Sequence, residues 1–281
     1  RGKRRKRARM HKITWGMPIV LYLFSAGVAA GAFCFAALTS RRPGAGFTAS
    51  SRASALLAPP ALVFGLAMLI LDLGYKIRFW FTMTAFNVAS PMSMGVWLLI
   101  LFSLVATLYA LFWLPMDLRR RIPLVGRWPL WDQEGIRDAL GFFGIPLAAL
   151  VAIYTGVLLS TTSIPLWRNT ALPALFCLSA LDTGFAGGVL LALLFSPQRR
   201  TEILAGPFHW LRESYRFLLP VYLVTAGVYL LLFFVPQRTP DVVLPLITGW
   251  RGLVWWLGVI GFGVLLPFVI VIFMAVHFWR V

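Results

Sequence analysis

The chain has 281 residues, of which 60% are hydrophobic and only 12% charged, and its mean hydropathy is +0.83. This balance excludes a soluble globular domain. The formal charge of +17 would suggest a nucleic-acid partner in a soluble protein, but here the basic residues lie at the ends of apolar segments, where they contact lipid headgroups. The sequence therefore predicts an all-α, multi-pass membrane protein without a nucleic-acid partner.

Seven apolar stretches have the length of about 20 residues that a helix needs to cross a bilayer. The first is too long for a secretory signal and is not followed by a small-residue cleavage site. Because the sequence starts without a methionine and ends inside an apolar stretch, we expect an eighth span in the complete chain. The seven predicted spans are 17–38, 54–74, 92–115, 139–160, 171–196, 215–235 and 251–279.

The spans divide the chain into three predicted parts. Residues 1–13 form a basic N-terminal tail with eight lysines and arginines, which we expect to lie on anionic lipid in preference to acting as a docking arm. Residues 14–197 form a bundle of five spans, and residues 198–281 form scaffold helices with interfacial tryptophans. If the tail is left out, the loops on its side of the membrane carry five basic residues and the loops on the other side carry thirteen. Because basic loops favour the cytoplasmic side, the N-terminus is expected outside the cytoplasm.

The stretch 86–97 gathers small polar side chains at the start of the third span. Asn87, Ser90 and Ser93 offer hydrogen-bond donors and acceptors, while Pro91 removes one backbone N–H and keeps Ser90 out of the helix. Ser90 is either the N-cap of a helix whose first residue is Pro91 or one wall of a site.

Because consecutive spans alternate in direction, several polar and aromatic residues from distant segments should reach the same membrane face. A few polar groups between apolar walls suit an amphipathic ring-shaped ligand whose tail lies in lipid. The residues expected to meet there are Tyr22, Asp72, Asn87, Ser90, Tyr154 and Trp167.

Two carboxylates lie in or beside spans and have competing explanations. Asp72 precedes Lys76 and Arg78, so it forms either a local ion pair or a proton-handling group. Asp182 lies about three turns inside the fifth span, where a carboxylate costs several kcal/mol unless it is protonated, paired or hydrated. A proton or water route is favoured over a structural hydrogen bond to Thr183 or a neighbouring helix.

Other patterns point to packing and loops. Gly27 and Gly31 are spaced for close helix contact, while the polar segment 39–53 is typical of a flexible connector and 116–138 of a basic loop.

Metal and haem ligands are not expected. Cys34 and Cys177 lack the spacing of a cluster site and are expected to be packing residues. The histidines are His11, His209 and His277, none of them in the interior of a span, so no pair of axial haem ligands is available.

Six ordered motifs in residues 13–197 resemble the polysulfide-reductase-type, NrfD-like membrane subunits. They are WGMPIVLYLFSAGVAAG at 15–31, DLG at 72–74 with RFW at 78–80, FNVASPMSMGVW at 86–97, YTGVLLS at 154–160, PLWRNT at 165–170, and SAL at 179–181 with TG at 183–184.

The resemblance implies a subunit of eight spans, without haem or an iron–sulfur cluster of its own, in the cytoplasmic membrane of a bacterium or archaeon. It would bind menaquinone or ubiquinone near one face within 14–197 and exchange electrons with a ferredoxin-like iron–sulfur subunit, itself attached to a molybdopterin enzyme, a hydrogenase or a multihaem cytochrome.

The same resemblance makes Tyr154 the hydrogen-bond partner of the quinone ring. Tyr22 replaces a family His or Asn in the first span, and Val88 and Met94 depart from the common Pro and Trp. Asp72 and Asp182 would carry protons, and the remaining pocket residues would be Trp15, Asn87, Ser90 and Trp167.

Two other functions compete with the quinone-linked one. Asp182 and the proline and glycine residues within spans would also fit a proton pathway or transporter, although the two halves show no inverted repeat. A membrane anchor without active quinone chemistry is the third possibility.

Overall fold

In the computed structural model, the described residues are 16–72, 90–115, 118–119, 121, 133–162, 167–234, 248–254, 256–258 and 261. Within them all regular structure is helical. Five helices are long and apolar enough to cross a membrane. They are α1 (Met17–Thr39), α2 (Ala45–Asp72), α4 (Pro91–Phe112), α6 (Glu134–Ser160) and α7 (Leu172–Phe195).

The C-terminal third begins with short helical turns that lead into one more long helix. These elements are η3 (Pro197–Arg199), α8 (Arg200–Ile203), η4 (Leu204–Phe208), α9 (His209–Phe234) and α11 (Gly249–Val254). All but the last residue of the predicted sixth span, 215–235, lies within α9, which is not among the five candidate spans. The predicted seventh span lies mostly outside the described residues, so the total of seven or eight spans remains a prediction. The boundary between the five-span bundle and the scaffold helices at 197/198 also remains a prediction.

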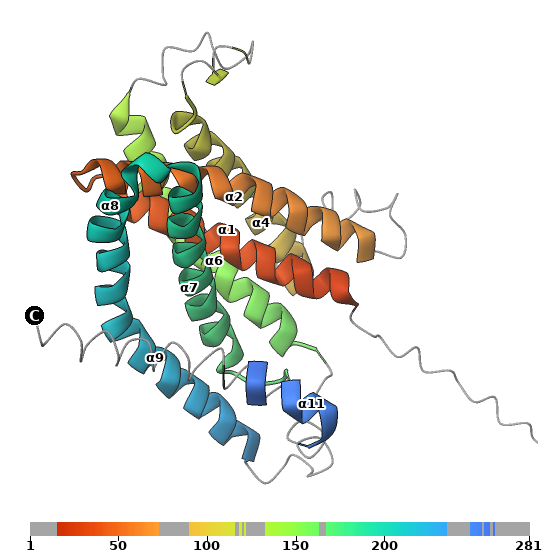
Figure 1. Cartoon of the computed structure of the whole chain (residues 1–281). Helices are drawn as coiled ribbons and strands as arrows, with labels where there is room; N and C mark the ends of the chain where they lie inside the picture. Colours follow the sequence, from red (N-terminus) through yellow and green to blue (C-terminus); the bar gives the residue numbers. More distant parts are fainter. Residues whose placement is uncertain are drawn as a thin grey trace, which may run out of the picture.

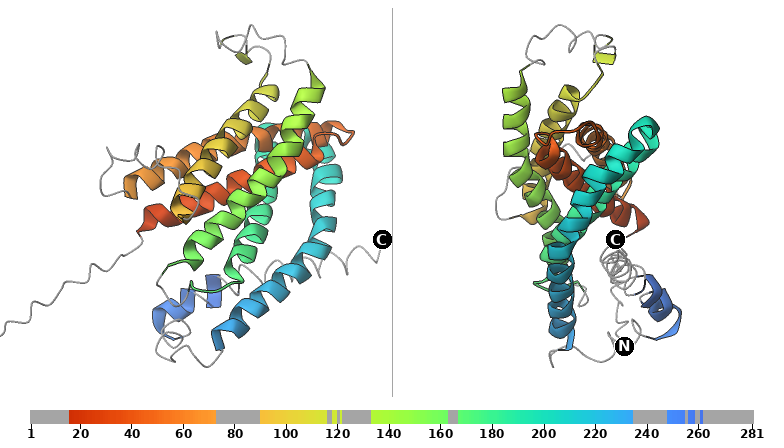
Figure 2. Two further views of the ribbon diagram at one scale, coloured as in Figure 1. Left: turned by 180° about the vertical axis from the view of Figure 1, so that it is seen from behind. Right: turned by 60° about the vertical axis from the view of Figure 1, so that its left-hand side comes forward.

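Helix α1 lies at the centre of the bundle. It packs against α2, α6 and α7, while α4 packs on α6 and α2, and α9 packs on α7. Consecutive long helices alternate in direction, so that α1 starts, α2 ends, α4 starts and α6 ends toward the same side (Figures 1 and 2). We call this side the site end, and the other side the opposite end.

Small residues allow α1 and α7 to touch through their backbones. A Cβ at Gly31 would overlap the Ala180 carbonyl group, and a Cβ at Gly184 would overlap the backbone of Gly31. Gly27 lies one turn earlier on the same contact, where a Cβ would be 3.4 Å from the Ala180 Cβ. The packing role predicted for the two α1 glycines is therefore confirmed.

Large side chains fill the space around this crossing. Phe33 of α1 packs edge-on against Phe102 of α4, with ring centroids 5.6 Å apart, and lies 5.0 Å from the Tyr109 ring. Phe142 and Phe143 on the outer face of α6 are each 70% exposed. Large apolar side chains on the outside of apolar helices are expected where the surface meets lipid.

The prediction of a flexible loop at 39–53 is wrong for most of that segment, because α2 already begins at Ala45. Ser50, Ser51 and Ser54 are fully buried. The Ser51 hydroxyl lies 2.7 Å from the Thr39 hydroxyl of α1, and the Ser54 hydroxyl donates to the Ser50 carbonyl at 2.8 Å. The small size of these serines, and the hydrogen bonds of Ser51 and Ser54, let this polar turn pack against α1 as a helix.

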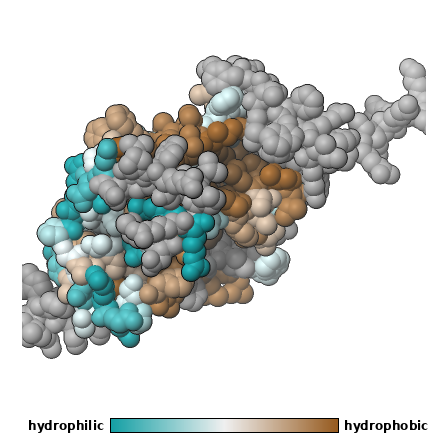
Figure 3. Space-filling model, turned by 90° about the horizontal axis from the view of Figure 1, so that it is seen from above, coloured by the Kyte–Doolittle hydropathy of each residue, from teal (hydrophilic) through white to brown (hydrophobic). Residues whose placement is uncertain are grey.

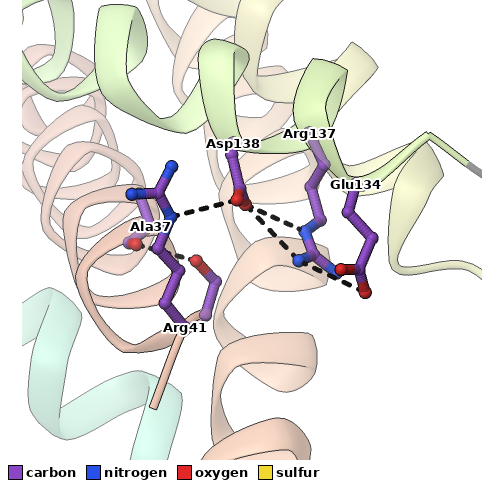
Figure 4. A network of polar contacts seen from close by, with 6 residues as sticks. Ala37, Arg41, Glu134, Arg137 and Asp138 are labelled. Atoms are coloured by element: carbon purple, nitrogen blue, oxygen red, sulfur yellow. Dashed lines mark hydrogen bonds and ion pairs between the residues drawn. The ribbon is translucent and has the colours of Figure 1, made fainter.

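Ion pairs join the turn that follows α1 to the start of α6 at the opposite end (Figure 4). Arg41 donates from Nε to Asp138 Oδ2 at 3.0 Å, and Arg137 Nη2 lies 3.4 Å from Asp138 Oδ1 and 3.9 Å from Glu134 Oε1. Residues 134–138, which the sequence places in a basic loop, are the start of α6.

Seen from above, hydrophilic residues gather on one part of the opposite end, beside apolar surface (Figure 3).

Replacing Asp138 by asparagine should lower the stability of the protein by about 1 kcal/mol, because both arginines lose a partly exposed carboxylate partner. The midpoint of thermal unfolding in detergent would measure the loss, which should shrink at high salt. The control is Glu202→Gln, a substitution of an exposed carboxylate. Equal midpoints for the two variants would contradict the expected role of Asp138.

Candidate functional site

The start of α4 lies at the site end and is well defined by Ser90 and Pro91. Ser90 is the N-cap, with extended backbone angles of φ −99° and ψ 114°, and Pro91 follows at the first helical position. The Met94 N–H donates to the Ser90 carbonyl at 3.1 Å. The Ser90 hydroxyl makes no capping hydrogen bond, but the backbone confirms that the helix starts at Ser90 and Pro91.

Tyr154 of α6 reaches this part of α4. Its side chain is 8% exposed, and its ring lies against Gly95, where a Cβ would overlap ring carbons and the hydroxyl oxygen. The α6 residue is thereby brought to the 86–97 stretch, as the alternation of spans predicts. Asn87 itself lies outside the described residues.

Tyr22 of α1 is a second buried phenol at the site end. It is 2% exposed and close enough to Tyr154 for the two phenol groups to interact electrostatically. Within the described part of the chain, neither hydroxyl has a hydrogen-bonded protein partner. A buried hydroxyl left without a partner costs about 1–3 kcal/mol, so both phenols are suited to donate to a ligand.

Asp72 lies at the same end, at the junction of α2 and α1. It is the last residue of α2 and is exposed, and its Oδ1 atom lies 3.2 Å from the position that a Cβ on Gly16 would take. Gly16 is the N-cap of α1, where a carboxylate is favoured by the helix dipole. Lys76 and Arg78, its predicted local ion-pair partners, lie outside the described residues.

Asp182 lies within α7 and faces α9. Its carboxyl group interacts electrostatically with the phenols of Tyr215 and Tyr222 of α9. The Thr183 hydroxyl donates to the carbonyls of Ser179 and Ala180 in its own helix, at 2.7 and 3.3 Å. The Thr183 hydroxyl is therefore bonded within its own helix, and the group that interacts with Asp182 is Tyr215, which the sequence alone did not single out.

The segment before α7 contributes a buried polar residue that sequence reasoning missed. Asn169 is 3% exposed; its Nδ2 donates to the Tyr229 carbonyl of α9 at 3.0 Å, and its Oδ1 accepts from the Ala171 N–H at 3.0 Å. These bonds tie the start of α7 to the end of α9. Trp167 lies just before it, partly buried against the core, whereas Trp15 lies outside the described residues.

The site end thus presents two buried phenols, a half-buried serine and an exposed carboxylate between apolar helices. This arrangement can donate hydrogen bonds to the oxygens of a flat ring while lipid-facing helices accommodate an apolar tail. Among the described side chains, no three His, Cys, Asp or Glu residues are grouped as metal ligands.

Comparison with known proteins identifies the family of the chain. Residues 6–278 match the family described as "Polysulphide reductase, NrfD". The chain is 30% identical over 264 residues to the C subunit of polysulfide reductase from Wolinella succinogenes, an alignment that covers 92% of this chain and 83% of that protein. It is 32% identical over 272 residues to protein NrfD of Escherichia coli K12, with 91% and 83% covered, and 28% identical over 278 residues to the NrfD homolog of Haemophilus influenzae, with 92% and 83% covered. The chain therefore belongs to the polysulfide reductase NrfD family of membrane proteins.

Proposed function

We propose that this chain is the quinone-binding membrane subunit of a multi-subunit respiratory oxidoreductase. The observation that carries the proposal is the meeting of Tyr22 and Tyr154 at the site end, both buried and both with a hydroxyl that has no hydrogen-bonded partner among the described residues. Membership of a family that includes the C subunit of polysulfide reductase supports it.

The residues at the site end fit a quinone ring. Tyr154 would donate a hydrogen bond to one ring oxygen, and Tyr22 or Asn87 to the other, because a phenol or amide donor matches a carbonyl acceptor. Ser90 offers a further hydroxyl at the start of α4. Trp15 and Trp167 would supply flat apolar surface at the membrane interface, where tryptophan is favoured.

Menaquinone or ubiquinone, when bound, would supply two-electron, two-proton redox chemistry that the side chains of this protein lack. The electrons would pass between the site and an iron–sulfur partner subunit, which itself joins a molybdopterin, hydrogenase or multihaem subunit. Asp72, exposed at the site end, would exchange protons with water, and Asp182 would carry them further into the bundle.

Purification of the intact complex tests this proposal. We expect bound quinone in the lipid extract and an iron–sulfur subunit that co-purifies with the chain. An iron–sulfur subunit without quinone, and no binding of a quinone analogue, would instead indicate a membrane anchor. A chain that purifies without redox partners and moves protons in vesicles would indicate the transporter that Asp182 also allows.

Replacing Asp182 by asparagine should slow quinol-coupled turnover by about tenfold or more, because an amide cannot take up or release a proton. Bound quinone should be retained, since Asp182 pairs with Tyr215 of α9. Turnover by the complex and its quinone content are measured side by side. Unchanged turnover would make the Asp182 carboxyl a structural partner of α9; Tyr215→Phe, which keeps the carboxyl but removes its partner, then measures that structural contribution.

A further inference from the structure

Gly95 occupies a special place in the second turn of α4. The Cβ that any other residue would carry there falls on the Tyr154 ring, against its hydroxyl oxygen and two ring carbons. At Gly31 and Gly184 the missing Cβ makes room for another backbone, and at Gly144 it makes room for the Phe33 ring. At Gly95 it makes room for the Tyr154 phenol. The proposed function makes this phenol a hydrogen-bond donor to the quinone.

Tyr154 cannot easily move away from Gly95 by a shift of its helix. Gly156 follows two residues later and therefore lies about 200° around α6, on the face away from Tyr154. A Cβ at Gly156 would lie 2.5 Å from the Pro173 Cα of α7, so α6 is already in close contact on that side. Protein interiors are close-packed, and a methyl group added at Gly95 has to displace the Tyr154 side chain.

We propose that Gly95 is a positioning residue for Tyr154, acting through the space it leaves for the phenol. This inference rests on the proposed function, because it concerns where the Tyr154 hydroxyl is held for a quinone oxygen. The direction of a hydrogen bond decides its strength, and the position of the hydroxyl depends on the hydroxyl-bearing edge of the ring lying against Gly95.

The test is a double-mutant cycle in the intact complex with Gly95→Ala, Tyr154→Phe and the combined variant, read out by titration with a quinone analogue. Each single variant should weaken binding by about tenfold, the effect of one lost hydrogen bond. The combined variant should bind no more weakly than Tyr154→Phe alone, since the misplaced hydroxyl is already absent. Gly95→Ala should also raise KM for quinol more than it lowers kcat.

Gly227→Ala is the matched control, because Gly227 lies in α9 and its Cβ would meet nothing within 4 Å; its binding and turnover should equal those of the natural protein. Independent, multiplicative losses in the double variant would overturn the positioning role, as would unchanged binding by Gly95→Ala while Tyr154→Phe is impaired. Unchanged binding by Tyr154→Phe would instead refute the proposed role of Tyr154.

Assembly gives a second readout if Gly95→Ala alone fails to accumulate in the membrane. The combined variant Gly95→Ala with Tyr154→Leu frees the space that the added methyl needs and should then restore the amount of assembled complex. Failure of this rescue would show that the added methyl acts through some contact other than Tyr154, and would overturn the inference.

Discussion

Replacing Tyr154 by phenylalanine is expected to weaken binding of a quinone analogue by about tenfold and to lower quinol-coupled turnover by at least as much. The ring and its packing on Gly95 are kept, so the change removes only the hydroxyl. That side chain is buried and its hydroxyl has no hydrogen-bonded partner among the described residues, so its loss would remove a donor to the ligand and leave no acceptor of the described part of the chain unpaired. Titration of the purified complex with the analogue measures the change.

Tyr109→Phe is the matched control for this prediction. Tyr109 is another buried tyrosine, 1% exposed, but it lies near the C-terminal end of α4 and packs on Phe33 and Trp113. Its substitution should alter stability at most and leave analogue binding unchanged. Equal binding by the Tyr154 and Tyr109 variants would remove Tyr154 from the site.

Much of the helical fold could be predicted because membrane helices are recognisable by their length and hydropathy. The predicted spans 17–38, 92–115 and 171–196 lie within three residues of α1, α4 and α7 at both ends. Alternation of direction then followed from connectivity alone, and with it the common end reached by Tyr22, Asp72, Ser90 and Tyr154.

The parts that could not be predicted depend on contacts between helices. The first nine residues of α2, 45–53, are polar enough to suggest a loop, and the burial of Ser50 and Ser51 among the helices is what the sequence did not indicate. Tyr215 becomes relevant only because α9 packs on α7. Gly95 belongs to the predicted site motif at 86–97, but its importance depends on its contact with the Tyr154 ring, which only the structure shows.

The contact between α1 and α7 is where a single methyl group should have the largest effect on stability. Gly31→Ala is expected to lower the stability of the protein by about 3 kcal/mol, because overpacking costs this much when the neighbour cannot adjust. The added Cβ would overlap the Ala180 carbonyl group, which belongs to a helix backbone and not to a flexible side chain. Helices α1 and α7 would have to separate to admit it.

Separation at Gly31 would also disturb the site, since α1 carries Tyr22 and packs against α6, which carries Tyr154. Gly31→Ala should therefore lower the midpoint of thermal unfolding and weaken binding of the analogue together, whereas Gly227→Ala, which adds the same methyl to an open position, should change neither. A Gly31→Ala complex that unfolds at the same temperature as the Gly227→Ala control would show that the two helices can part at little cost. The close approach of their backbones would then not be what holds Tyr22 beside Tyr154.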